Sequence, residues 1–288
     1  AELMSGDDEG IFQWLAVNSL LGALSPEGPR GRPLRGRRPA ATLDLGGGSV
    51  QIAYEVSAEQ AAAAEATQEH AAFMRWLDLP ETHRGALYQH SYLGFGLMSA
   101  RQGMLQEAQA AGLGDENPCM MPSGGEGKRR PGFGADRADG CVRLITRMLR
   151  RSGPCAGQEP EEGSCGFADV WKGPGWGRGA APRVVAGSFF FDALREAGHV
   201  PPERLETEVT PATYRALAGE ACGLEVGRAA AVYAGAGKRA EWLCFDLSYL
   251  ATLLTAGFGF REDQRLVAVK EISRDGRSYR ANWALGVA

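Results

Sequence analysis

The stretch from Ala41 to Tyr54 holds the residues best suited to chemistry. Two apolar, β-prone runs flank three consecutive glycines and a serine, which predicts a strand, a tight turn and a returning strand. Because glycine allows positive φ and has no Cβ, such a turn lets several backbone N–H groups converge on one anion. We interpret the turn as a phosphate cradle formed by Gly46, Gly47, Gly48, Ser49 and Gln51. The alternative is an ordinary glycine-rich hairpin.

Two carboxylates accompany this cradle. Asp44 ends the incoming strand, where a carboxylate can hold the water ligands of a divalent cation that neutralises polyphosphate charge. Glu9 belongs to the acidic start of a segment whose apolar residues recur at helical spacing. One interpretation makes Glu9 a general base that faces the phosphate site. The other makes it a partner of the helix dipole, and Asp44 a solvated surface group.

Aromatic residues and one histidine are further candidates. Three phenylalanines, Phe189 to Phe191, follow an apolar strand. They form either core or a face on which a purine or pyrimidine stacks. His90 lies in an aromatic, strand-like stretch, and we interpret it as a hydrogen-bonded structural histidine rather than a catalytic one.

Length and charge exclude several classes of protein. A chain of 288 residues is long enough to bury a core, as one large or two modest domains. Its formal net charge of −4 argues against a general nucleic-acid or anionic-membrane surface. No stretch has the unbroken apolar length of a signal peptide or a spanning helix, so any leader or anchor is expected upstream of Ala1.

The cysteines indicate an oxidising compartment. They are six in number and form no CxxC motif and no metal-ligand spacing with histidine: Cys119, Cys141, Cys155, Cys165, Cys222 and Cys244. Zinc is therefore disfavoured, and disulfides are the preferred interpretation, with buried free thiols as the alternative. Disulfides would place the protein in the secretory lumen or outside the cell.

Strands and helices alternate along the chain, which makes α/β the natural fold class. Helices are expected over residues 6–22, 57–79, 97–111, 142–151, 211–221, around 229, and 241–254. Strands are expected over residues 87–96 and 267–272, with a strand or strand-to-helix junction over 184–192. An exposed connector is expected over residues 25–39, a mobile loop over 112–138, and the start of a terminal element over 281–286.

Several of these segments together resemble the apyrase superfamily, the nucleoside tri- and diphosphatases. The resemblance starts with residues 8–18 and the hairpin 44–51 and covers nearly the whole chain. Further family-like segments follow in the expected order: residues 90–96, 165–171, 188–192, 244–249 and 283–286. Residues 165–171 and 270–286 look most like plant-type soluble apyrases. Residues 90–96 and 244–249 are also similar to Golgi and secreted nucleoside diphosphatases.

This resemblance implies an actin-like (ribonuclease H-like) α/β fold with nucleotide and a Ca²⁺ or Mg²⁺ ion in a cleft between two lobes. It implies that Glu9 activates the attacking water, that Asp44 holds metal-bound water, and that residues 46–51 form one of two phosphate hairpins. Phe191 and Trp242 fall where the family places base-stacking aromatics. The implied substrates are nucleotides of the ATP, ADP, GDP and UDP class, hydrolysed to nucleoside monophosphate and phosphate by a monomer.

The chain departs from the family pattern in three places. Leu243 stands where some members carry tyrosine, and Val50 replaces a threonine. The family's other phosphate hairpin and a further segment precede the one containing Glu9, and the sequence starts too late to include them. We therefore expect mainly the second lobe: residues 1–39 as the end of the first lobe and a connector, 40–272 as the second lobe, and 273–288 as the start of the return.

Cysteine pairing and location follow from loop bracketing together with the resemblance. The expected disulfides join neighbours in sequence order: Cys119 with Cys141, Cys155 with Cys165, and Cys222 with Cys244. The expected location is the Golgi lumen or the cell exterior, with membrane contact only through an anchor upstream of Ala1 and no nucleic-acid partner.

Two other interpretations compete with an apyrase. Exopolyphosphatases and guanosine pentaphosphate phosphatases share the Asp-x-Gly-Gly-Gly-Ser hairpin, but they typically have Glu where this chain has Gln51, and they lack the cysteine framework. A non-catalytic nucleotide-binding or inert lobe is the other alternative, because half of the phosphate clamp would be missing.

Overall fold

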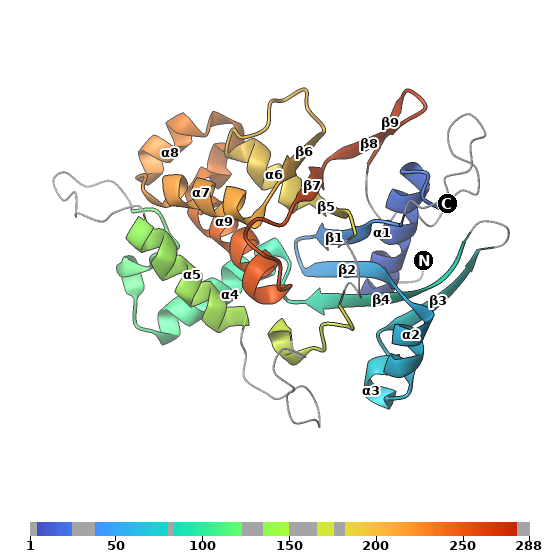
Figure 1. The fold of residues 1–288 in the computed structure, drawn as a ribbon. Helices are drawn as coiled ribbons and strands as arrows, with labels where there is room; N and C mark the ends of the chain where they lie inside the picture. The colour runs from blue at the N-terminus through green and yellow to red at the C-terminus, as the bar shows by residue number, and fades with distance from the viewer. Residues whose placement is uncertain are drawn as a thin grey trace.

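The computed structural model describes residues 5–24, 38–79, 83–122, 135–149, 166–175 and 182–280, and a seven-stranded mixed sheet organises them. Its strands are β1 (Ala41–Leu45), β2 (Ser49–Val56), β3 (Met74–Leu79), β4 (His83–Leu93), β5 (Val184–Ser188), β6 (Glu206–Val209) and β7 (Leu266–Val269). The strand order is β3-β4-β2-β1-β5-β7-β6 (Figure 1). β5 runs parallel to β1 and to β7, and the other neighbouring pairs are antiparallel.

Helices and a small separate sheet surround these strands. The α-helices are α1 (Gly6–Leu20), α2 (Ala58–Glu65), α3 (Gln68–Ala71), α4 (Leu97–Ala110), α5 (Ala135–Leu149), α6 (Phe189–Glu196), α7 (Pro211–Cys222), α8 (Val226–Val232) and α9 (Leu243–Thr252). The shorter turns are η1 (Gly114–Glu116), η2 (Phe167–Asp169), η3 (Ala234–Trp242) and the π-helical η4 (Leu253–Gly257). β8 (Glu271–Arg274) and β9 (Arg277–Arg280) pair with each other. Figure 1 shows α4, α5, α7, α8 and α9 grouped beside one end of the large sheet.

The large sheet is covered on both faces, which explains why all five residues of β1 are buried. Alternate residues point to opposite faces of a strand. Leu43 and Leu45 enter the main core, which also contains buried residues of α4 to α9. Asp44 therefore points to the opposite face. The N-terminal helix α1 packs there, against β1, β2 and β4.

The expected helix over residues 57–79 is wrong in its second half. The alanine-rich part forms α2, which Ser57 begins with a capping box, and α3 follows as a single turn. Residues from Met74 onward instead form β3, which pairs antiparallel with β4 at the edge of the sheet. Pairing with β4 supplies the backbone hydrogen bonds that a helix would have made, so tertiary context overrides the local composition.

Most other expected elements are confirmed, with shifted boundaries. The strand expected over 87–96 is β4, the helix over 97–111 is α4, and the junction over 184–192 is β5 followed by α6. The helix expected from residue 142 already starts at Ala135, and the run 267–272 divides between β7 and β8. Most of the connector, residues 123–134 of the loop and residues 281–286 lie outside the described residues.

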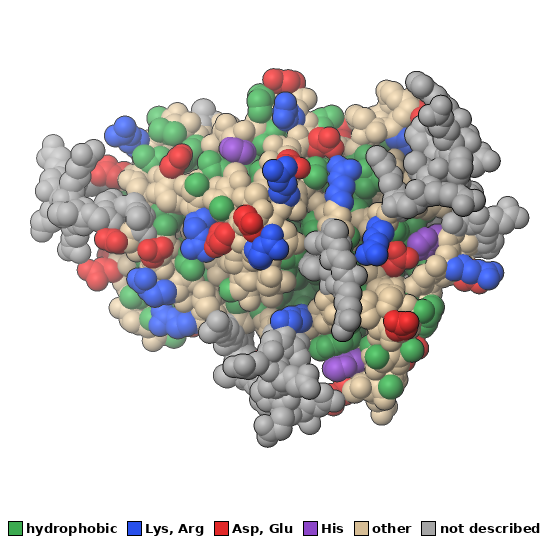
Figure 2. All heavy atoms as spheres, viewed as in Figure 1, with side chains coloured by type: hydrophobic (Ala, Val, Ile, Leu, Met, Phe, Trp, Pro, Cys, Tyr) green, Lys and Arg blue, Asp and Glu red, His purple; other side chains and the backbone are tan. Residues whose placement is uncertain are grey.

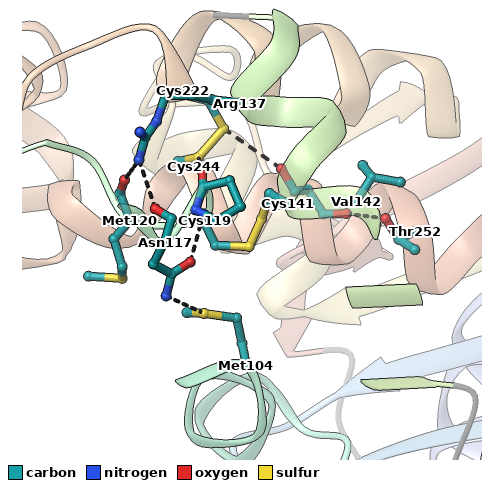
Figure 3. The surroundings of a disulfide bond; sticks show 12 residues. Met104, Asn117, Cys119, Met120, Arg137, Cys141, Val142, Cys222, Cys244 and Thr252 are labelled. Carbon is teal, nitrogen blue, oxygen red and sulfur yellow. Dashed lines mark hydrogen bonds between the residues drawn. A yellow bond between two sulfur atoms is a disulfide. The ribbon is translucent and has the colours of Figure 1, made fainter. Parts of the chain in front are cut away.

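Two of the three expected disulfides are confirmed. Cys119 bonds to Cys141 and Cys222 bonds to Cys244, each closing a sequence separation of 22 residues (Figure 3). Cys155 and Cys165 lie outside the described residues. The two bridges are neighbours, because Cys244 Sγ approaches the Pro118 carbonyl oxygen to 3.6 Å. Together they fasten the segment after α4 to α5, and α7 to α9.

A buried ion pair joins α4 to α9. Arg101 donates two hydrogen bonds to Asp246, of 2.9 and 2.5 Å, and both residues are at most 9% exposed. The same guanidinium lies 4.8 Å from the ring centroid of Trp242. A paired buried charge is costly to break, because removing one partner leaves the other uncompensated. The pair therefore holds α4 firmly in place, and α4 supports the site described below.

The surface carries charges of both signs. Figure 2 shows basic and acidic side chains interspersed over the described part of the face in view. Among the described residues, no helix combines the length and the apolar character needed to cross a bilayer.

Candidate active site

Three polar residues form a row across the face of the sheet that α1 covers. Asp44 on β1 lies opposite Gln51 on β2, and Gln51 lies opposite Ser91 on β4. Directly paired residues of neighbouring strands project to the same side of a sheet. The row thus continues through three adjacent strands.

The N-terminus of α1 brings Glu9 to this row. Ser5 caps the helix by accepting a hydrogen bond from the Asp8 N–H. Gly10 then packs directly on β2, since a Cβ built on it would lie 3.4 Å from the Cβ of Gln51. This close approach places Glu9 Oε2 3.1 Å from Gln51 Nε2. Burial raises the pKa of the Glu9 carboxyl above its usual 4.5.

Gln51 connects Glu9 to the glycine hairpin. Its Nε2 atom also lies 2.7 Å from Ser49 Oγ and 3.1 Å from Ser91 Oγ. The structure therefore brings together Glu9, Ser49 and Gln51, which the sequence assigned to one site. It adds Ser91, which the sequence analysis did not single out.

The hairpin turns its carbonyl groups toward α4. The Gly46 carbonyl accepts from Leu97 N–H, and the Gly47 carbonyl accepts from the first-turn N–H groups of α4, at 2.9 to 3.1 Å. The Gly48 carbonyl accepts from Gly94 N–H at 2.8 Å. Within the described part of the chain, the N–H groups of Gly47 and Gly48 have no hydrogen-bond partner. Two free amides at an accessible turn can bind an anion.

The hairpin glycines do not supply the left-handed backbone that the sequence predicts for this turn. None of Gly46, Gly47 and Gly48 has a positive φ, so the turn does not depend on left-handed backbone. A Cβ on Gly48 would meet nothing within 4 Å. The amides are free because the N-terminus of α4 takes up the carbonyl groups, not because the chain is left-handed.

Gly96 is the glycine on which this packing depends. It caps α4, and a Cβ built on it would lie 2.3 Å from Ser49 N and 2.5 Å from the carbonyl carbons of Gly47 and Gly48. Real Cβ atoms do not approach backbone so closely. The absence of a side chain at Gly96 thus permits α4 to touch the hairpin.

Asp44 is buried and only partly satisfied. It is 8% exposed, and its Oδ1 atom has no hydrogen-bond partner. Burial raises the pKa of its carboxyl to about 6, the Ser188 side chain opposes this through a hydrogen bond, and the charge of Glu9 adds to the rise. Ser188 itself has φ of 58°, which is rare and strained for a residue with a side chain.

The unpartnered Oδ1 atom of Asp44 suits a divalent cation that carries water ligands. A buried oxygen without a partner can accept a hydrogen bond from a cation's water ligand, and an oxygen donor suits Ca²⁺ or Mg²⁺. The described residues contain no group of three or more His, Cys, Asp or Glu that could hold a metal ion directly. Asp44 is thus suited to hold metal-bound water rather than to form a complete metal site.

We expect Asp44→Asn to stabilise the chain near neutral pH when no divalent cation is present. A folded-state pKa of about 6, against 3.8, means that the folded chain keeps a proton that the unfolded chain loses. Stability therefore falls as pH rises from about 4 to about 6. At about 1.4 kcal/mol per pKa unit, the gain of the variant is roughly 1–3 kcal/mol at pH 7.5.

Urea unfolding at pH 4 and at pH 7.5 measures this effect. The variant and the parent should differ little at pH 4. Asp263→Asn is a matched control, because Asp263 is exposed and its pKa is lowered by Arg261. A parent that is as stable as Asp44→Asn at pH 7.5 would contradict the expected cost of the buried carboxylate.

The two aromatic candidates differ in accessibility. Phe191 is fully buried, with the Arg195 guanidinium 4.9 Å from its ring centroid. It offers no surface on which a base could stack, so the sequence-based role for Phe191 is not supported by the fold. A phenylalanine run after a buried strand has here the core role that was its alternative. Trp242 is half-buried, with Arg101 against its ring.

His90 behaves as a structural residue. It projects away from the α1 face, and its ring packs edge-on to Tyr92 and at a tilt to Phe73, with centroid distances of 4.5 and 5.0 Å. Burial lowers its pKa, so the neutral form is favoured. The structural interpretation is therefore the one that the geometry supports.

Comparison with known proteins agrees with this geometry. The GDA1/CD39 (nucleoside phosphatase) family matches residues 1–288. The rice (Oryza sativa subsp. japonica) protein named Probable apyrase 1 is 35% identical over 99% of this chain and 57% of its own length. Apyrase 1 of Arabidopsis thaliana is 32% identical over 99% of this chain and 59% of its own length. The chain thus spans less than two thirds of these relatives.

A solved structure shares the fold. The nucleoside triphosphate hydrolase of Neospora caninum superposes with a TM-score of 0.60 at 14% identity, covering 98% of this chain and 63% of that one. The expected actin-like α/β fold class is thereby confirmed. The family match also favours the apyrase-type interpretation over an exopolyphosphatase. With its mixed sheet, its glycine hairpin and a sequence match over its whole length, the chain belongs to the GDA1/CD39 (nucleoside phosphatase) family.

Proposed function

We propose that the protein containing this chain hydrolyses the terminal phosphoanhydride bond of nucleoside tri- or diphosphates with water. The observation that carries the proposal is the hydrogen-bonded path from the Glu9 carboxylate through Gln51 to Ser49 of the hairpin. A proton acceptor and a phosphate cradle are thus joined through one side chain. Family membership supports the same reaction class.

Glu9 is the proposed general base. Burial raises its pKa above the usual 4.5, which strengthens the ionised carboxylate as a proton acceptor. The hydrogen bond from Gln51 keeps one carboxylate oxygen in place and leaves the other for water. The attacking water gives its proton to Glu9 as its oxygen bonds to phosphorus, while the phosphoanhydride P–O bond breaks and the nucleoside di- or monophosphate leaves with the bridging oxygen.

The hairpin is the proposed binding site for the transferred phosphoryl group. Phosphoryl transfer needs an aligned water and donors aimed at the equatorial oxygens rather than covalent catalysis. The free amides of Gly47 and Gly48 and the Ser49 hydroxyl are such donors. Asp44 would hold the water ligands of Ca²⁺ or Mg²⁺, and the cation would supply the positive charge that neutralises the phosphates.

Further features of the proposal follow the family. We propose that residues 40–272 form the second of two lobes, that residues 1–39 and 273–288 belong to the edges of the first, and that Trp242 contributes to base binding. The two confirmed disulfides support an oxidising location, in the secretory pathway or outside the cell. A monomer with an ATP, ADP, GDP or UDP substrate remains our expectation.

Phosphate release tests the proposal. ATP, ADP, GDP and UDP should be offered to this chain and to a version extended upstream of Ala1, each with and without Ca²⁺ or Mg²⁺. The extended version should release phosphate only with the cation, and this chain far less. Nucleotide binding without phosphate release by either version would show a non-catalytic lobe instead.

A further inference from the structure

Ser91 contacts the side-chain amide of Gln51, which links Glu9 to the glycine hairpin. It lies opposite Gln51 across β2 and β4, and its hydroxyl is 3.1 Å from Gln51 Nε2. The same nitrogen faces Glu9 and Ser49. Three oxygens therefore surround a group that has two hydrogens to donate.

The chemistry of the three oxygens fixes the amide's direction. An ionised carboxylate can only accept, so Gln51 must turn its NH₂ end, and not its carbonyl, toward Glu9. The two amide hydrogens are shared among the three oxygens, and Ser49 Oγ makes the shortest contact with Gln51 Nε2, at 2.7 Å. A hydroxyl that accepts from Gln51 still has its own hydrogen, so Ser49 can donate that hydrogen to a phosphate oxygen. Ser91 is the third oxygen that keeps the NH₂ end of Gln51 turned toward Glu9 and Ser49.

The first residue of α1, Gly6, leaves room for the Ser91 side chain. A Cβ built on Gly6 would lie 2.4 Å from Ser91 Oγ and 2.9 Å from Ser91 Cβ. Gly6 has no positive φ, so its helical position does not itself require glycine. Alanine would be the better helix former there. The missing side chain instead makes room for the Ser91 hydroxyl beneath the helix N-terminus.

We propose that Ser91 is a positioning residue, whose hydroxyl, for which Gly6 leaves room, orients the Gln51 amide and through it the Glu9 carboxylate. Its effect on catalysis rests on the proposed function, whereas the orientation of Gln51 is a property of this chain. In an active extended version, Ser91→Ala should lower kcat by about fivefold to tenfold, as expected for one lost hydrogen bond. KM should change little, because Ser91 acts through Gln51.

Nuclear magnetic resonance of this chain tests the orientation without activity. The side-chain NH₂ resonances of Gln51 are identified by their loss in Gln51→Glu. In Ser91→Ala one of the two proton resonances should move toward the value of a free amide. Gly6→Ala should cause the same change, because its methyl group displaces the Ser91 hydroxyl. Ser248→Ala is the matched control, because Ser248 is a buried serine of α9 that lies beside Cys222 of α7. It should leave the Gln51 resonances unchanged.

The possible results separate the effect of Ser91 on the orientation of Gln51 from its effect on catalysis. Ser91→Thr keeps the hydroxyl and should restore the Gln51 resonances and kcat. Parental Gln51 resonances in both Ser91→Ala and Gly6→Ala would overturn the proposal, whether or not the protein hydrolyses nucleotides. Shifted resonances with a parental kcat would overturn its catalytic part. An extended version without any phosphate release would count against the proposed function, and the resonances would then decide the orientation alone.

Discussion

Replacing Glu9 by glutamine is expected to reduce phosphate release by the extended version by about 10²–10⁴-fold, the usual contribution of a general base. Glutamine has nearly the same shape and can still accept a hydrogen bond from Gln51. It cannot take a proton from water. The fold and the cradle should therefore persist while the chemical step is lost, so kcat should fall and KM should change little.

The pH profile gives this prediction a second readout. A base works only when ionised, and burial raises the pKa of Glu9 above 4.5. Activity of the parent should therefore rise with pH through that raised pKa. The residual activity of Glu9→Gln should not show this rise with pH.

Asp7→Asn is the matched control, because Asp7 belongs to the same acidic first turn of α1. It should retain most of the activity. If Glu9→Gln turned over at the parental rate, or if Asp7→Asn lost as much, Glu9 would be only a partner of the helix dipole. Initial-rate measurements of phosphate release over pH 4 to 9 decide between these outcomes.

Local sequence chemistry predicts the parts of this site but not their assembly. Strand, glycine turn and strand are visible in residues 41–54 because the turn and strand preferences act over a few residues. The contact between Glu9 and Gln51 joins positions 42 residues apart, and no spacing rule reaches that far. Its prediction came from resemblance to a family. The structure adds the physical reason, which is that Gly10 lets α1 lie directly on β2.

The sequence-based expectations that differ from the structure have the same cause, which is contact between segments far apart in the sequence. Alanine-rich composition predicts a helix through residue 79, yet β3 forms because an edge of β4 is available. Phe191 has the chemistry of a stacking residue, but its position after buried β5 places it in the core. The roles of Gly96 and Ser91 depend on atoms of other strands and helices. Those neighbours become apparent only after folding, so composition and periodicity cannot identify them.

Replacing Gly96 by alanine is expected to cause the other large loss, of about 10²-fold or more in phosphate release by the extended version, because misplacing reactants by about 1 Å can cost that much. The new Cβ would lie 2.3 Å from Ser49 N and 2.5 Å from two hairpin carbonyl carbons. These are backbone atoms, so no side chain can rotate aside. Either α4 or the hairpin must move, and the amides of Gly47 and Gly48 then lose their alignment.

Gly103→Ala provides the comparison within the same helix. Its Cβ would approach only the flexible side chain of Met148, with Sδ at 3.0 Å and Cγ at 3.5 Å. That variant should keep activity. Gly48→Ala adds a methyl group in the hairpin itself without a clash, and it should also remain active. If Gly96→Ala folds with parental circular dichroism and hydrolyses nucleotides at the parental rate, the carbonyl groups do not need α4. The free amides would then have to be held by something other than the helix N-terminus.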